Sequence, residues 1–132
     1  MDKEKQPGIK VDSIILAESF FKRVPDVTIP IPLKININVS NNINNDKKQL
    51  ITEMKVSLNT DSDKVFGNFV YIGVFSVMDD DENMSLQQFA EHNAPACLFP
   101  YVREEIQNRS VKAGLPPIII QPINIVALNK CH

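Results

Sequence analysis

The chain has 132 residues, of which 43% are hydrophobic, and this is enough for one domain with a modest core and too little for two. That hydrophobic content excludes wholesale disorder. A net charge of −2, with Lys and Arg scattered and no aromatic residues interleaved among them, disfavours nucleic-acid binding.

The first residues and the cysteines bear on cellular location. Residues 1–10 are charged and contain no apolar run, so we expect no signal peptide, and no stretch approaches membrane-spanning length. Cys97 and Cys131 are too few and too unpatterned for a disulfide framework. These features predict a cytosolic protein without membrane insertion.

The beginning of the chain is predicted to be extended. Residues 1–8 are polar, and we expect them to be disordered. Residues 9–21 predict a strand with apolar side chains on both faces, and residues 24–32, with three prolines, predict an extended crossover. The strand is expected to place Val11, Ile15 and Phe21 on one face and Ile14, Leu16 and Phe20 on the other.

Three more strands are predicted. Residues 33–40 and 50–59 alternate apolar with polar side chains, which is typical of half-buried strands, and residues 41–48 between them predict a polar loop. Residues 65–78 are apolar at both parities. One main helix cannot cover both sides of such a sheet, so we expect another copy of the chain or a ligand on the second side.

Two helices are predicted next. Residues 79–82 form an acidic, solvated turn whose spacing does not suit Ca²⁺. Ser85 and Gln88 form a capping box that opens a short helix ending near His92. Residues 93–113 predict a long amphipathic helix with Asn93 as its N-cap. Its predicted features are a buried stripe of Leu98, Val102 and Ile106, an ion pair between Glu105 and Arg109, a kink or separate first turn at Pro100, and a stop at Gly114.

The segment after this helix is unusually apolar. Residues 115–125 combine five isoleucines with three prolines, which excludes both a helix and a central strand. Such a segment must cover a core, pack on a partner subunit or line a groove for an apolar ligand.

Residues suited to catalysis are sparse. Cys97 and His92 could meet as a nucleophile pair only through folding, and Cys97 beside an apolar helix face is better explained as a small core residue. Cys131 and His132 supply two ligands, too few for a closed metal site. Phosphate-binding glycine loops, dinucleotide fingerprints and nucleophile elbows do not occur. We therefore expect no enzyme activity, no cofactor and no metal.

Several motifs in the second half resemble the SecB preprotein chaperone family. LFPYVREEI at 98–106, Gly-Leu-Pro-Pro at 114–117 and QPINIVAL at 121–128 match in order and spacing, and GVFSV at 73–77 resembles the end of the family's last strand. The resemblance covers the first half of the chain only by pattern. It implies an α+β fold over residues 1–132, with a four-stranded antiparallel sheet, one long and one short helix on one face, and assembly as a homotetramer, a dimer of dimers.

The same resemblance implies an ATP-independent holdase that binds unfolded or precursor polypeptides in apolar grooves. For Phe99 and Tyr101 a core or subunit contact is an equally good interpretation. The implied client-binding residues are Leu33, Ile35, Ile37, Phe75, Phe99, Tyr101, Ile118, Ile120, Ile123 and Ile125.

The family docks on the SecA motor through acidic residues, and here the pattern departs. Glu18 occupies one such position, but Lys22 and Asn68 stand where the family carries acids, which weakens electrostatic docking. The helix that flanks the family's groove is nearly absent before His132. We therefore expect client holding more than general export.

Three functional hypotheses remain open. The first is a divergent SecB-type holdase, acting in export or dedicated to one client such as the antitoxin of a toxin–antitoxin pair. The second is a scaffold protein that uses the fold for oligomerisation alone, and the third is a small enzyme.

Overall fold

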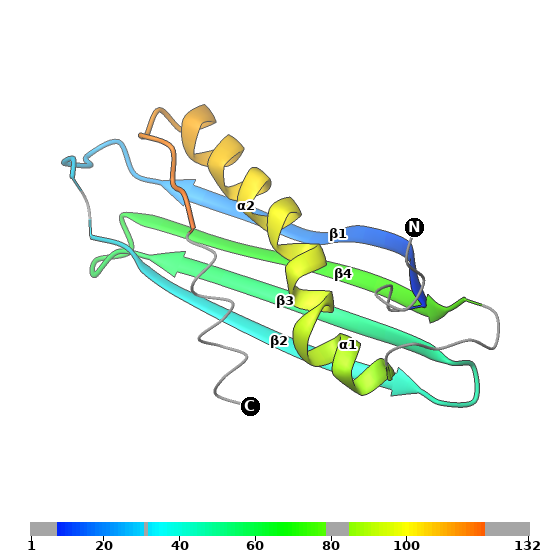
Figure 1. The fold of residues 1–132 in the computed structure, drawn as a ribbon. Helices are drawn as coiled ribbons and strands as arrows, with labels where there is room; N and C mark the ends of the chain where they lie inside the picture. The colour runs from blue at the N-terminus through cyan, green and yellow to red at the C-terminus, as the bar shows by residue number, and fades with distance from the viewer. Residues whose placement is uncertain (1–7, 31, 79–84, 121–132) are drawn as a thin grey trace.

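A computed structural model describes residues 8–30, 32–78 and 85–120. Within these residues the chain forms four strands followed by two helices (Figure 1). Their bounds are β1 Ile9–Arg23, β2 Lys34–Asn44, β3 Gln49–Asn59, β4 Val65–Val77, α1 Leu86–His92 and α2 Ala94–Lys112.

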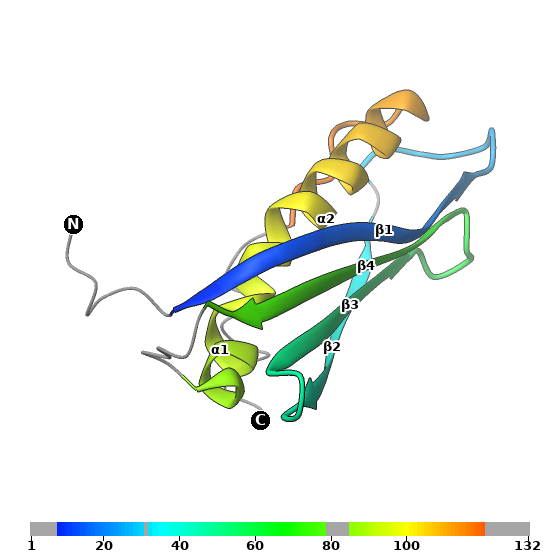
Figure 2. The ribbon, with the colours of Figure 1, turned by 90° about the vertical axis from the view of Figure 1, so that its right-hand side faces the viewer.

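The strands form one antiparallel sheet in the order β1-β4-β3-β2. Both helices lie on the same face of this sheet, and the described residues place no helix on the other face (Figure 2). The predicted α+β architecture is therefore confirmed. Strands β1 and β2 are its two edges.

The alternating strands were predicted correctly, but β2 is longer than expected. Residues 41–44 were assigned to a loop, and they instead continue β2 and pair with residues 49–52 of β3. Their polar side chains suit the strand because Asn41 Oδ1 accepts a 2.7 Å hydrogen bond from Thr52 Oγ1, while Asn42 and Asn44 are exposed. A strand edge facing water tolerates the asparagines that a pattern interprets as a turn.

The predicted faces of β1 were wrong because the strand contains two irregularities. Its pairing with β4 shifts register between Val11 and Ser13 and again between Leu16 and Glu18, and each shift adds an unpaired residue that inverts the alternation. Ile14 and Phe21, which were expected on opposite faces, both pack against the core under α2. Ile15 and Phe20 are exposed, with relative accessibilities of 48% and 46%.

One face of strand β4 packs in the hydrophobic core. Apolar side chains lie on both faces of this strand, as predicted. Phe69 is fully buried in the larger of two hydrophobic clusters, beneath α2. Phe75 is fully buried in the second cluster, where its ring packs edge to face on Phe89 of α1 with centroids 5.0 Å apart. Helix α2 adds Leu98, Val102 and Ile106 to the larger cluster, as predicted.

The helix boundaries follow the predicted signals with one exception. The capping box of Ser85 and Gln88 opens α1, and Gly114 ends the second helical segment with φ +76°. Asn93, however, keeps a right-handed helical backbone and makes no side-chain capping bond, so it links the two helices instead of capping α2. Helix α2 continues through Pro100, so the separate first turn predicted there as one alternative is wrong, while a kink of the helix axis at Pro100 stays a prediction.

Polar contacts fix α2 against β1. Glu105 and Arg109 approach to 3.6 Å, which confirms the predicted pair, and both also contact Ser19. Ser19 Oγ donates a 2.6 Å bond to Glu105 Oε2, while Arg109 donates to Ser19 Oγ and to its carbonyl oxygen. The helix thus has a fixed rotation and height over the first strand.

Two predictions made at the sequence level fall partly outside the described residues. The disorder expected for residues 1–8 concerns a region described only at Gly8, whose carbonyl accepts a 2.8 Å hydrogen bond from Met78 N. The acidic turn at residues 79–82 lies entirely outside them.

Candidate binding groove

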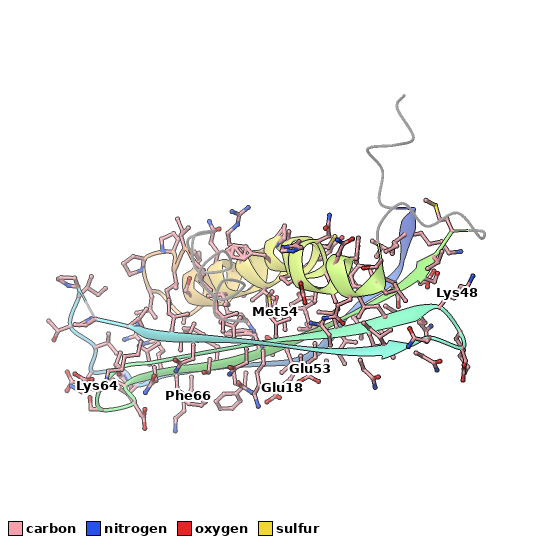
Figure 3. The ribbon with its side chains drawn as sticks, turned by 60° about the horizontal axis from the view of Figure 1, so that its bottom comes forward. Glu18, Lys48, Glu53, Met54, Lys64 and Phe66 are labelled. Atoms are coloured by element: carbon pink, nitrogen blue, oxygen red, sulfur yellow. The ribbon has the colours of Figure 1, made fainter. Side chains whose placement is uncertain are left out.

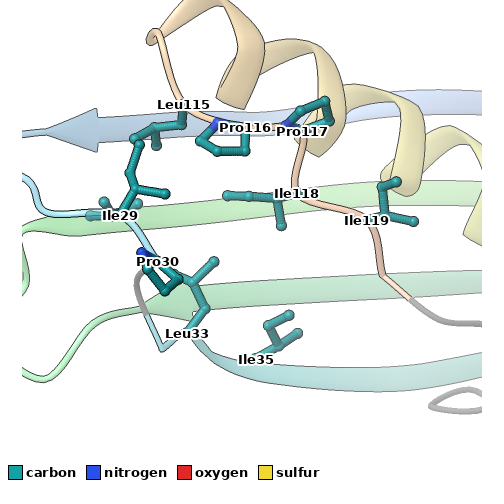
Figure 4. Close-up of a pocket in the computed structure, with 10 residues that line it drawn as sticks. Ile29, Pro30, Leu33, Ile35, Leu115, Pro116, Pro117, Ile118 and Ile119 are labelled. Carbon is teal, nitrogen blue, oxygen red and sulfur yellow. The ribbon is translucent and has the colours of Figure 1, made fainter.

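An apolar cleft of about 320 Å³ lies between the crossover that precedes β2 and the segment that follows α2 (Figure 4). The crossover forms one wall, the segment after α2 forms the other, and the beginnings of β2 and β4 complete the lining. The lining residues are Ile29, Pro30, Leu33, Ile35, Val65, Leu115, Pro116, Pro117, Ile118 and Ile119.

The second wall is held by hydrogen bonds to the end of α2. After the turn at Gly114, Leu115 N donates to the Ser110 carbonyl at 3.0 Å. Ser110 Oγ accepts a 3.0 Å bond from Ile118 N and donates to the Gln107 carbonyl at 2.7 Å. Ser110 is fully buried, and its hydroxyl satisfies the backbone N–H of the half-buried Ile118.

The first wall is held at the end of β1. Val24 N donates to the Lys64 carbonyl at 2.9 Å, and the guanidinium of Arg23 binds the carbonyl oxygens of Val24, Pro25 and Ala113. The prolines of the crossover restrict its backbone and remove N–H donors. The wall is therefore extended without being a strand.

The cleft is open and offers apolar contact. Ile29 and Ile119, one from each wall, are 53% and 56% exposed, while Leu33, Ile35 and Ile118 between them are half-buried. Covering one such aliphatic side chain contributes about 1.5–3 kcal/mol. All ten lining side chains are apolar, so the cleft can bind apolar groups but offers no general acid, base or nucleophile.

The predicted client-binding residues are only partly brought together. Leu33, Ile35 and Ile118 line the cleft, and Ile37 is half-buried one step further along the same face of β2. The structure adds Ile29 and the other lining residues, which the sequence argument did not name. Part of the signal for them was present, because the proline-rich crossover was expected to be extended and the segment from 115 onward was expected to be extended and apolar.

Four of the remaining predicted residues are described, and they lie outside the cleft lining. Phe75, Phe99 and Ile120 are 0%, 6% and 1% exposed and belong to the core of this protomer. Tyr101 is 46% exposed on α2, with its ring 6.2 Å from that of Tyr71. Ile123 and Ile125 lie outside the described residues. Contact of these side chains with a client stays a prediction.

A second apolar surface lies on the helix-free face of the sheet. Phe20 of β1 and Phe66 of β4 are both exposed and pack edge to face with centroids 5.9 Å apart. Glu18, Glu53 and Phe66 all lie on this face, opposite Met54, which points toward the helices (Figure 3). Glu18, the predicted motor contact, is therefore exposed beside apolar side chains.

A third surface is formed where α2 leaves β1 uncovered. Leu16 and Tyr101 are 44% and 46% exposed, and Tyr71, which pairs with Leu16 across the strands, contacts Tyr101. Burial, reinforced by the nearby carboxylates of Glu105 and Glu104, raises the pKa of Tyr71 above its ordinary value. The Tyr71 hydroxyl therefore stays protonated at neutral pH.

The candidate catalytic residues gain no support from the geometry. Burial raises the pKa of the Cys97 thiol, which reduces its thiolate fraction and thus its nucleophilicity. His92 Nε2 lies 3.9 Å from Glu91 Oε2, and both side chains are on the exposed side of α1. Among residues 8–30, 32–78 and 85–120, three or more His, Cys, Asp or Glu side chains nowhere gather as a metal site would require.

Comparison with known proteins decides the family. A family model described as preprotein translocase subunit SecB matches residues 4–132. The chain belongs to the SecB family. The resemblance inferred from the LFPYVREEI and Gly-Leu-Pro-Pro motifs is thereby confirmed, and the fold described above is a SecB fold.

Curated relatives agree with this assignment. The protein-export protein SecB of Bartonella bacilliformis is 34% identical over 99 residues, which cover 73% of this chain and 61% of that protein. SecB of Dichelobacter nodosus is 28% identical over 140 residues, covering 97% of this chain and 88% of the relative. An uncharacterized protein of Methanocaldococcus jannaschii is 32% identical over 116 residues, which cover 84% of this chain and 74% of that protein. The chain thus spans about three fifths of the Bartonella SecB it matches.

A solved structure shares the fold. The SecB-like chaperone of Mycobacterium tuberculosis, in complex with a peptide from the HigA1 antitoxin, superposes with a TM-score of 0.70 over 86% of each chain. Its sequence is 14% identical to this one, so the likeness concerns architecture. As for membranes, none of the helices in the described residues has the length and apolar character to span a bilayer.

Proposed function

We propose that this SecB-family protein is an ATP-independent holdase that keeps unfolded or precursor polypeptides from aggregating by binding their apolar segments in the cleft. The observation that carries this proposal is a preformed, open cleft whose ten lining side chains are all apolar. Three of them, Leu33, Ile35 and Ile118, are also among the client-binding residues that the family resemblance implies.

Burial of apolar surface would drive the binding of a client segment in the cleft. An extended client segment would cover Ile29 and Ile119, which now face water, and would lose its own exposed apolar surface at the same time. Apolar contact is not directional, so the cleft would select hydrophobicity and approximate size over sequence. Release then follows from the binding equilibrium without a nucleotide.

The test is suppression of aggregation. Light scattering of a chemically denatured protein diluted into buffer should stay low in the presence of the wild-type chain without ATP. Ile119→Asp, which places a charge on an isoleucine of the cleft that is 56% exposed, should abolish most of the effect. Ile51→Asp is the matched control, because Ile51 is 40% exposed on the helix-free face. Equal scattering with and without the wild-type chain would refute the proposal.

A dedicated chaperone of one client is the alternative form of this function. It is supported by the structural neighbour from Mycobacterium tuberculosis, which was solved with a peptide from an antitoxin. A panel of unrelated denatured proteins separates the two forms. A general holdase protects most of the panel, whereas a dedicated chaperone protects its own client alone.

We propose that the chain assembles with itself, as the dimer of dimers predicted from the family. Leu16, Tyr101 and Val111 are exposed apolar side chains on the helix-bearing side, where a second copy could cover them. A scaffold role, in which assembly is the whole function, would show as stable oligomers that leave aggregation of the denatured protein unchanged.

Contact with a SecA motor is proposed to be weak. Glu18 is exposed on the helix-free face and could contribute to it, but Lys22 lies four residues further along β1 on the same face and opposes the acidic field. Calorimetric titration against a SecA protein should give a weak signal that Glu18→Lys removes. Submicromolar binding that is insensitive to this change would refute the proposed contact.

We also propose that the protein binds without catalysing a reaction and that it works in the cytosol. The raised pKa of Cys97 and the purely apolar lining of the cleft support the first point. Cys97 and Cys131 are too few for a disulfide framework, which suits a reducing compartment and supports the second point.

A further inference from the structure

Arg23 stands where both walls of the cleft begin. It is the last residue of β1, so the crossover wall starts at its own carbonyl, while α2 ends just before the other wall. Its guanidinium Nη2 donates to Pro25 O at 3.1 Å, on the crossover side, and Nη1 donates to Ala113 O at 3.0 Å, on the helix side. A third bond, from Nε to Val24 O at 3.0 Å, fixes the plane of the group.

These contacts join two segments that are far apart in the sequence. Ala113 follows α2 directly, and Gly114 and Leu115 then lead into the second wall (Figure 4). Carbonyl oxygens at a helix C-terminus lack intrahelical partners and carry partial negative charge, so they bind a cation well. The rigid fork of a guanidinium can bridge such a carbonyl to a second one at a fixed separation, which a flexible ammonium cannot do.

The rest of each wall is anchored independently. Val24 N binds Lys64 O at one wall, and Ile118 N binds Ser110 Oγ at the other. Each of these bonds ties a wall to its neighbouring element. The Arg23 guanidinium instead connects the start of one wall to the start of the other, and so it bears on the distance between the two walls, to which Ile29 and Leu115 respectively belong.

We propose that Arg23 is a positioning residue that sets the width of the cleft and thereby the size of the client side chains it admits. This inference rests on the proposed function, since it concerns the selectivity of the same cleft. A wall separation that is fixed before binding favours side chains that fit it, because the walls then lose no conformational entropy when the client binds. Once the link is removed, fitting side chains lose that advantage, while larger ones gain room.

The test compares two fluorescent peptides by anisotropy. They have equal length and charge and differ only in carrying leucine or tryptophan at their apolar positions. The full chain is used as wild type, Arg23→Gln, Arg23→Lys and the control Lys22→Gln, which removes the same charge from the neighbouring exposed position. Circular dichroism and light scattering establish that fold and assembly are retained.

We expect Arg23→Gln to lower the affinity for the leucine peptide about tenfold and the affinity for the tryptophan peptide by less than about threefold. The ratio of the two affinities therefore changes. Arg23→Lys should shift the preference part of the way, because an ammonium can bind only some of the carbonyls. Lys22→Gln should leave the preference unchanged.

Three results would overturn the inference. Equal losses for both peptides would mean that Arg23 supports the fold without setting the width, and an equal effect of Lys22→Gln would mean that charge alone is responsible. Loss of native structure in both Arg23 variants would likewise assign Arg23 to folding. Failure of the wild type to bind either peptide is a different outcome, because it removes the proposed function itself.

Discussion

Two glycines in β4 allow aromatic rings to lie close over the strand. A Cβ placed on Gly73 would lie 2.8 Å from Phe75 Cε2 and 3.0 Å from Leu98 Cδ2, and one on Gly67 would lie 2.8 Å from Phe69 Cε2. Phe69 and Phe75 are fully buried, so neither ring can move aside without disturbing the packing beneath the helices. The sequence pattern shows these glycines as gaps in an apolar strand, whereas the structure shows why the gaps are needed.

Gly73→Ala should therefore reduce the free energy of unfolding by about 1–3 kcal/mol, as overpacking in a core does. Urea unfolding followed by circular dichroism measures this change. Ser40→Ala, on the exposed face of β2, is the control and should stay within about 0.5 kcal/mol of wild type. An unfolding midpoint for Gly73→Ala equal to that of the control would show that the contact is relieved at no cost.

Cys97 provides a prediction on pH. Because burial raises the pKa of this thiol, less of it is ionised near pH 8 than of a free thiol, and its reaction with a disulfide reagent should be slower at that pH. The rate should climb with pH and reach half its plateau above the midpoint of free cysteine. The measurement uses a Cys131→Ser background, so that only Cys97 reacts. A midpoint at or below that of free cysteine would contradict the burial seen here.

At the level of helices and strands, the ends of the elements depend on caps and on pairing. Ser85 Oγ accepts a 3.1 Å hydrogen bond from Gln88 N, and Gln88 Oε1 accepts a 3.4 Å bond from Ser85 N, whereas the Asn93 side chain makes no comparable bond. Both residues are good N-cap types in the sequence. What distinguishes them is the backbone, which is extended at Ser85 and helical at Asn93.

Ser85→Ala should accordingly reduce stability by about 0.5–2 kcal/mol, while Asn93→Ala should have an effect of less than about 0.5 kcal/mol. Thermal unfolding of the two variants against wild type measures the difference. A larger effect from Asn93→Ala than from Ser85→Ala would show that the cap lies between the helices after all.

These elements also show how far the sequence could lead. Hydrophobic pattern and capping signals predicted the four strands and two helices described, and the family resemblance named Leu33, Ile35 and Ile118, which line the cleft. The faces of β1 could not be predicted, because the extra residues near Ser13 and Glu18 leave no mark on local hydrophobicity. Ile29 and Leu115 could not be paired across the cleft either, since their approach depends on where the crossover and α2 end in space.

For the molecule as a whole, the question is which apolar surface a second copy covers. If the helix-bearing side is the interface, the mass in solution should be two or four times the 14.9 kDa of one chain. Tyr101→Asp should lower that mass, because it places a charge inside the contact. Phe66→Asp, at 37% exposure on the helix-free face, is the control and should leave the mass unchanged.

Light scattering coupled to size exclusion measures these masses. If Phe66→Asp dissociates the oligomer and Tyr101→Asp does not, the interface lies on the helix-free face of the sheet. A wild-type mass equal to that of one chain would leave both surfaces open and refute assembly.

Proline supplies three of the ten cleft-lining residues, Pro30, Pro116 and Pro117. None of them has an N–H, so these parts of the two walls cannot build the alternating backbone bonds by which a sheet edge recognises the direction of an added strand. A bound segment should therefore be accepted in either N-to-C orientation. A peptide and its reversed-order counterpart should bind within about threefold of each other, as expected where side-chain burial supplies the affinity.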